Sequence, residues 1–119
     1  MKHLICASIQ FNISLGYIDA NLDTATAALQ RVAQQGARLA VLPEMWSCGY
    51  DYRNLTELAK ETPRVLEEMQ KECLKLDLVT VGSLPELEDD RIFGIFNLSH
   101  GNSACRFFPS LKPDAQKGK

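Results

Sequence analysis

A glutamate stands where the sequence predicts that a buried strand ends. In the stretch LAVLPEMWSCGYD, residues 39–51, an apolar run reaches Pro43, and Glu44 follows with Met45 and Trp46 directly behind it. Apolar neighbours would withdraw the carboxylate partly from water. A carboxylate in such a setting can take a proton from a reacting group and return it, so the pattern indicates a general base.

Glu44 also has a structural interpretation. Its carboxylate could cap a nearby turn or pair with the guanidinium group of Arg38 or Arg53, and ion pairs with no catalytic role occupy similar settings. The residue types alone leave both interpretations open. The position of Glu44 in the fold therefore has to be inferred from the rest of the chain.

Four cysteines are the candidates for a nucleophile or a metal ligand: Cys6, Cys48, Cys73 and Cys105. They form no C-x-x-C pair and have no histidine at ligand spacing, so we expect neither a metal site nor a disulfide framework, and a cytoplasmic location is the default. Cys48 is a poor nucleophile candidate because the negative charge of Glu44 would disfavour its thiolate. Cys6 and Cys73 fall on apolar stripes and are expected in the core.

The composition is that of a single ordinary globular domain. The chain has 119 residues, of which 45% are hydrophobic and 24% charged, and this length rarely holds more than one domain. A formal net charge of -2 gives no electrostatic case for a nucleic-acid or membrane partner. The lone histidines, His3 and His100, are expected at a strand end and in a turn, and we expect no cofactor.

Hydrophobic periodicity predicts a strand, a helix and a second strand in the first third of the chain. Residues 3–11 and 38–42 are apolar enough for buried strands, and an apolar stripe at helical spacing runs through residues 22–33 between them. Either Asn21 or Asp23 is expected to cap the start of the helix, and Gly36 is expected to end it. This order predicts a βαβ unit whose two strands are parallel.

The second half of the chain continues the alternation. The predicted elements are a short helix at 54–60, a helix at 62–77 with Thr62 as N-cap and Pro63 in its first turn, and strands at 78–83, 91–99 and 103–108, the last antiparallel. Strands that alternate with helices predict an α/β sheet. Functional residues of such sheets lie beyond the carboxyl ends of parallel strands, and Glu44 follows the second strand directly.

Four stretches of the chain resemble the nitrilase or carbon–nitrogen hydrolase superfamily, and they follow one another along the chain in the order that the family has. They are residues 39–51 with their Leu-Pro-Glu and Gly-Tyr, residues 5–25 with Gln10 and the asparagine of the first helix, residues 79–86 with a Gly-Ser turn, and residues 95–99 with an aromatic-Asn strand. The resemblance covers roughly residues 1–100. It implies a four-layer αββα sandwich, of which this chain holds the first half, a mixed sheet with flanking helices.

The resemblance also implies a Glu–Lys–Cys mechanism in which Glu44 is the glutamate. Lys112 lies at a suitable distance for the lysine, but Leu111 and Pro113 do not match the family context. The nucleophilic cysteine would lie beyond Lys119. We therefore interpret residues 1–119 as a truncated carbon–nitrogen hydrolase domain with an atypical tail at 101–119.

Three functions follow as hypotheses. The first is hydrolysis of non-peptide C–N bonds in small amides, carbamoyl compounds or ω-amides, or less readily nitriles, by a full-length parent. The second is a catalytically inactive module for binding or oligomerisation, which the missing nucleophile favours. A sheet without its partner sheet should also expose an apolar face and form homo-oligomers. The third, a flavodoxin-like ligand-binding domain, is disfavoured because only one glycine follows the first strand, at Gly16.

Overall fold

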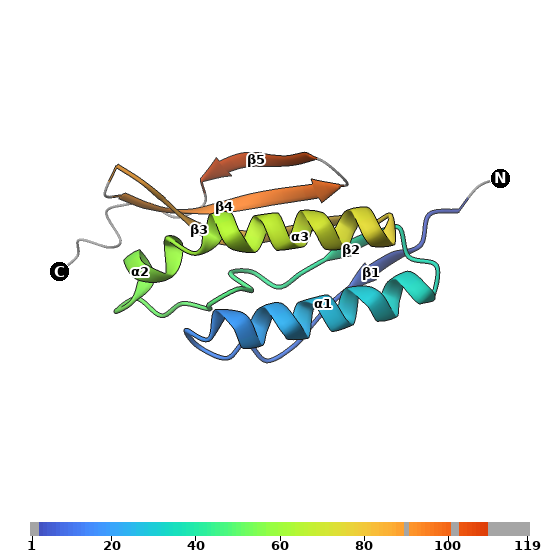
Figure 1. Ribbon diagram of the computed structural model, residues 1–119, viewed down its shortest axis with the longest axis horizontal. Coiled ribbons are helices and arrows are strands. Elements are labelled where there is room, and N and C mark those ends of the chain that lie inside the picture. The colour runs from blue at the N-terminus through green and yellow to red at the C-terminus, as the bar shows by residue number, and fades with distance from the viewer. Residues whose placement is uncertain (1–2, 90, 101–102, 110–119) are drawn as a thin grey trace.

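The computed structural model describes the backbone of residues 3–89, 91–100 and 103–109, and the side chains of residues 3–89. Its helices and strands alternate first and then give way to strands alone (Figure 1). In chain order they are β1 (Cys6–Ser8), α1 (Ile18–Gln34), β2 (Leu39–Val41), α2 (Leu55–Ala59), α3 (Thr62–Leu76), β3 (Val79–Glu88), β4 (Arg91–His100) and β5 (Ser103–Pro109).

The strands form one mixed sheet in the order β1-β2-β3-β4-β5. β1, β2 and β3 are parallel, and β3, β4 and β5 are antiparallel. Parallel neighbours need a crossover between them, which α1 supplies before β2 and the α2–α3 segment before β3. The prediction of a mixed sheet with flanking helices is confirmed, including the antiparallel fifth strand.

The helices cover one face of the sheet, where α1 and α3 run side by side (Figure 1). Ala7, Ala40 and Thr80 lie in register across β1, β2 and β3 and share one face of the sheet, since side chains alternate along each strand. Ala40 is fully buried, and the Thr80 hydroxyl lies 3.3 Å from Cys73 Sγ of α3. The predicted core position of Cys73 is therefore confirmed.

Several predicted boundaries are wrong. β1 is only three residues long instead of spanning 3–11, and β3 continues to Glu88 instead of stopping at 83. The Gly-Ser pair expected to form a turn lies inside β3, where the long antiparallel pairing with β4 keeps the chain extended. α1 begins at Ile18, before both expected caps, and ends as predicted near Gly36, which has a φ of 94°.

Thr62 does not cap α3. Glu61 occupies the N-cap position, and the buried Thr62 side chain donates a hydrogen bond to the carbonyl of Pro85 in β3. The hydroxyl therefore ties the start of the helix to the sheet instead of closing the helix on itself. A sequence pattern cannot separate these two uses of a threonine, because both place it at a helix start.

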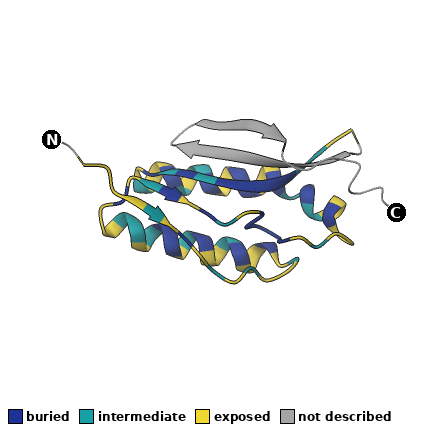
Figure 2. Cartoon of the chain, turned by 180° about the vertical axis from the view of Figure 1, so that it is seen from behind, coloured by how far each residue is buried: buried dark blue, intermediate teal, exposed yellow. Residues whose placement is uncertain are grey.

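The other face of β1–β3 is open. Its residues are exposed or half-buried, and they are Cys6, Ser8, Leu39, Val41, Val79 and Val81. Figure 2 shows β1 and β2 from this side, in front of the helices. The predicted core position of Cys6 is wrong, because its side chain falls on this face. The predicted exposed apolar face is confirmed for these three strands.

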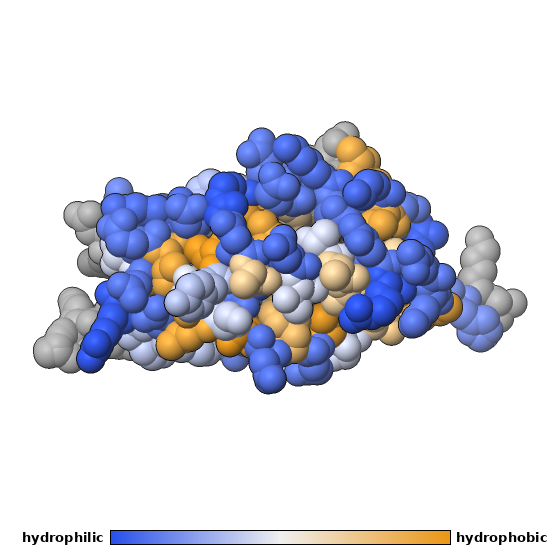
Figure 3. Space-filling model, turned by 60° about the horizontal axis from the view of Figure 1, so that its bottom comes forward, coloured by the Kyte–Doolittle hydropathy of each residue, from blue (hydrophilic) through white to orange (hydrophobic). Residues whose placement is uncertain are grey.

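The outer surface of α1, unlike the open face of β1–β3, mixes polar and apolar side chains. Figure 3 turns this side of the molecule forward and shows apolar side chains broken up by polar ones. α1 buries Ala25, Ala28 and Leu29 and leaves its charged residues outside, as an amphipathic surface helix does. Among the described residues, no helix has the length and apolar content that a membrane crossing requires.

We expect the open face to drive self-association. Val41, 44% exposed at the centre of this face, is a suitable probe, and Val41→Glu should weaken association at least ~10-fold because a buried carboxylate without a partner is costly. Sedimentation velocity across a concentration series measures the effect. Leu74→Glu, at a 59% exposed position of α3, is the matched control and should change nothing. A compact monomer at all concentrations would contradict the expectation.

Candidate functional site

Glu44 lies three residues beyond the end of β2, at the carboxyl edge of the parallel part of the sheet. Its side chain is exposed, whereas residues 45–49 that follow it are all buried. The carboxylate is therefore presented to solvent from a loop that is itself part of the core. This is the edge at which open α/β sheets carry their functional groups.

The buried loop is held first by β3. The Met45 N–H donates a hydrogen bond of 2.7 Å to the buried Ser83 hydroxyl, and the Gly49 N–H donates one of 2.8 Å to the Met45 carbonyl. Met45 has a φ of 52°, in the left-handed region that residues with a Cβ seldom adopt. Such a conformation persists only where surrounding contacts enforce it. The Met45 side chain, 1% exposed, supplies further contacts of this kind.

Asn21 holds the loop from the other side. Its side-chain amide nitrogen donates hydrogen bonds to the Ser47 carbonyl at 2.8 Å and the Ser14 carbonyl at 2.9 Å. Its side-chain oxygen accepts the Ser14 N–H at 2.8 Å. Asn21 is 1% exposed, and its bond to the Ser47 carbonyl is buried, whereas its two bonds to Ser14 are part-buried. The asparagine that the sequence analysis assigned to a helix cap instead joins two loops, because α1 begins before it.

One expectation about Glu44 is wrong, and one of its structural alternatives is not seen. Met45 and Trp46 do not withdraw its carboxylate from water, because their side chains point into the core and are each 1% exposed. Arg38 does not pair with Glu44 either, since its guanidinium lies 2.7 Å from the carboxylate of Asp77. Within residues 3–89, no ion pair involves Glu44 or Arg53.

Tyr50 is the polar partner of Glu44. The Glu44 carboxylate acts on the Tyr50 hydroxyl. Burial of the hydroxyl, followed by hydrogen bonding to Glu44 and by the negative charge of Glu44, raises the pKa of Tyr50 well above its ordinary value of 10. The ring of Tyr52 lies beside it, with the two centroids 5.8 Å apart. In the sequence, Tyr50 stands out only as part of the Gly-Tyr pair of the motif. Its short spacing from Glu44 is the one sequence signal for a contact between the two side chains.

The described cysteines do not supply a thiolate at this site. Cys48 is fully buried, and burial, together with the charge of Asp51, raises the pKa of its thiol although a hydrogen bond with Ser47 lowers it. Burial is the main cause of the raised thiol pKa, where the sequence predicted the charge of Glu44 as the cause. That Cys48 is not the nucleophile stays a prediction. The side chains of Cys105, Lys112 and His100 lie outside the described residues, and His3 is exposed before β1.

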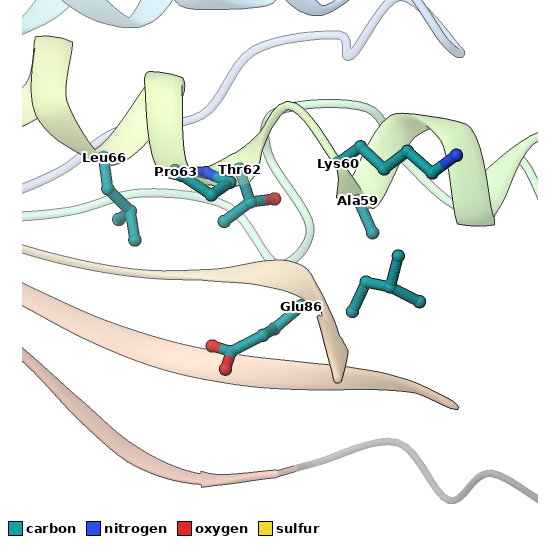
Figure 4. A pocket seen from close by; sticks show the side chains of 7 residues that line it. Ala59, Lys60, Thr62, Pro63, Leu66 and Glu86 are labelled. Carbon is teal, nitrogen blue, oxygen red and sulfur yellow. The ribbon is translucent and has the colours of Figure 1, made fainter. Parts of the chain in front are cut away.

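The two described cavities do not include Glu44. One, of about 240 Å³, lies between the α2–α3 connection and β3 and is lined by Lys60, Thr62 and Glu86 among others (Figure 4). Figure 4 shows the Glu86 carboxylate turned away from Lys60, whose ammonium pairs with Glu57 at 3.0 Å. The other, of about 410 Å³, lies at the start of α1. No group of metal-binding side chains occurs among the described residues.

Replacing Asn21 by alanine should cost about 2–4 kcal/mol of unfolding free energy, because buried groups of two loops lose their partners together. Urea denaturation measures the loss. Asn54→Ala removes a single exposed hydrogen bond to Asp51 and should cost less than about 0.5 kcal/mol. Equal losses of unfolding free energy in both variants would contradict the role of Asn21 in joining the two loops.

Thiol reactivity should separate the cysteines. In a Cys105→Ser background, at a concentration where the chain is monomeric, we expect Cys6 to react at once with a disulfide reagent. Cys48 and Cys73 should react only on unfolding, because burial raises the pKa of both thiols. Absorbance of the released chromophore follows the reaction. Rapid modification of Cys48 in the folded chain would contradict the structure of the loop.

Comparisons with known proteins agree on one family. A family model described as carbon-nitrogen hydrolase matches residues 5–108, eight residues past the end of the resemblance at residue 100. The 2-oxoglutaramate amidase of Bacillus subtilis is 37% identical over 56% of this chain, and the chloroplastic omega-amidase of Arabidopsis thaliana is 29% identical over 82%. The chain spans only 26% and 28% of these relatives' lengths.

Solved structures show the same fold. A cysteine-to-alanine variant of the amidase from Nesterenkonia sp. AN1, in complex with butyramide, superposes with a TM-score of 0.82 at 19% identity, covering 92% of this chain and 44% of that one. A CN-hydrolase superfamily protein from Xanthomonas campestris gives a TM-score of 0.71 at 16% identity, covering 83% and 37%. The match over residues 5–108 shows that the chain belongs to the carbon-nitrogen hydrolase family.

Proposed function

We propose that Glu44 is the general base of an enzyme that hydrolyses small amides. The observation that carries the proposal is the placement of its carboxylate: a buried loop presents it to solvent at the carboxyl edge of the sheet. Tyr50 adds a hydrogen-bond donor on one side. The ion pair with Arg38 or Arg53 that was the structural alternative to a turn cap is not present among the described residues.

The chemistry follows from the resemblance to the family. A cysteine thiol would lose its proton to Glu44 as its sulfur attacks the amide carbon, and Glu44 would pass that proton to the nitrogen as the C–N bond breaks. Glu44 would then take a proton from the water that attacks the acyl carbon and return it to the sulfur as the acyl–sulfur bond breaks, which releases the acid and restores the thiol. A lysine would stabilise the oxyanion of each tetrahedral intermediate.

This chain supplies only the base in the proposal. Cys48 and Cys73 are too buried for the nucleophile, and Cys6 lies on the open face of the sheet. The resemblance to the family implies a nucleophile in sequence beyond residue 119, with residues 1–119 as part of the hydrolase domain and 101–119, which the family match enters as far as residue 108, as its tail. Lys112 stays a prediction for the lysine. A cytoplasmic location and a homo-oligomer also stay predictions.

Small amides, ω-amides among them, are the proposed substrates. The two relatives named above are a 2-oxoglutaramate amidase and an omega-amidase. The Nesterenkonia amidase binds butyramide, and its active-site cysteine adds acrylamide. A small primary amide is common to these proteins, so nitriles are the less favoured class.

A second candidate function rests on the open sheet face. The exposed or half-buried apolar residues of β1–β3 would suit a catalytically inactive module that binds a partner or oligomerises. This candidate needs no nucleophile. It predicts association without turnover, whereas the first candidate predicts turnover that depends on Glu44.

The discriminating experiment measures ammonia release from a panel of short amides by the full-length parent, which would carry the nucleophile, and by two variants of it. Glu44→Gln keeps the shape and removes the base, so any turnover should fall by about 10²–10⁴-fold. Glu57→Gln, at an exposed glutamate of α2, is the control and should retain activity. Turnover that survives in Glu44→Gln would exclude the proposed role. An inactive parent that self-associates would favour the module instead.

A further inference from the structure

Ser83 lies in β3 and takes no part in the chemistry above, yet it touches the loop that carries Glu44. Its side chain is 1% exposed, and its hydroxyl oxygen accepts the N–H of Met45, the residue directly after Glu44, at 2.7 Å. The two residues are 38 positions apart in the chain. A contact of this separation is specified by the fold and not by local chain geometry.

Gly82, the neighbour of Ser83, makes room for the same loop. A Cβ at this position would lie 2.9 Å from Cδ1 of Trp46 and 3.2 Å from Cβ of Leu42. Trp46 is 1% exposed and has little freedom to move away. A glycine is therefore required for the indole of Trp46 to pack against the β3 backbone. The Gly-Ser pair contacts the loop from within β3 and does not form a turn.

We propose that Ser83 is a positioning residue for Glu44, which fixes the left-handed turn at Met45 and so directs the neighbouring carboxylate to Tyr50. The inference rests on the proposed function only where it treats Glu44 as a catalytic base. The positioning of Glu44 by Ser83 is a property of this chain. A displacement of about 1 Å at a reacting group can reduce a rate by ~10²-fold, so a fixed base matters.

The reason lies in the hydrogen-bond requirements of the loop. Without the Ser83 hydroxyl, the buried Met45 N–H has no acceptor there, and an unsatisfied buried donor is unfavourable. The φ of 52° at Met45 would then relax toward the negative values that residues with a Cβ prefer. Rotation at Met45 moves the adjoining Glu44, and the hydrogen bond between Glu44 and the Tyr50 hydroxyl is the contact that reports the movement.

Three variants of the full chain test the inference. Ser83→Ala removes the acceptor, and Ser83→Thr keeps it. Thr80→Val removes a hydroxyl that is equally buried in the same strand but faces Cys73 of α3. Nuclear magnetic resonance of ¹³C-labelled tyrosine follows the ionisation of Tyr50, and amide hydrogen exchange follows the Met45 N–H.

In Ser83→Ala we expect Tyr50 to ionise at lower pH than in the parent, with its pKa moved toward 10, and the Met45 amide to exchange about 10-fold faster. Ser83→Thr and Thr80→Val should keep the parental ionisation of Tyr50. The inference is overturned if Tyr50 in Ser83→Ala ionises as in the parent, or if Thr80→Val lowers its pKa equally. Neither readout needs turnover, so this inference and the proposed catalytic role can fail separately.

Discussion

Buried backbone groups in the loop after β2 need partners that no ladder or helix supplies, and the rest of the site depends on how they are satisfied. Outside regular structure, an unpaired buried N–H or C=O is costly. Here the Met45 N–H binds the Ser83 hydroxyl, the Ser47 carbonyl accepts from Asn21, and the Cys48 carbonyl accepts the N–H of Gly16 at 2.8 Å. The loop therefore finds its partners in β3, in α1 and in the segment before α1.

This constraint explains why one exposed side chain stands on a buried segment. Residues 45–49 turn inward to fill the core beside β3, and the left-handed conformation at Met45 accompanies the change of direction. Glu44, directly before it, stays in solvent at the edge of the sheet. The arrangement separates two tasks: packing belongs to the residues after Glu44, and the carboxylate is available for chemistry with a tyrosine hydroxyl beside it.

The elements and their order could be predicted from periodicity, and Glu44 could be placed at the sheet edge from the strand that precedes it. Side-chain partners could not. Asn21, Thr62 and Ser83 each bond to backbone groups in other parts of the chain, whereas local patterns report only on local caps and turns. Cys6 was assigned to the core because its strand is apolar, but strand alternation does not reveal which face the helices cover.

The central claim is that the fold holds the Glu44 carboxylate in one place, and the most direct measurement is the nuclear Overhauser effect between the Glu44 side chain and the Tyr50 ring in the folded chain. The account predicts cross-peaks between the Glu44 methylene protons and the Tyr50 ring protons, with a single well-populated rotamer of Glu44. Averaged rotamers without contact to Tyr50 would contradict it, and would leave the carboxylate as an ordinary solvated surface group.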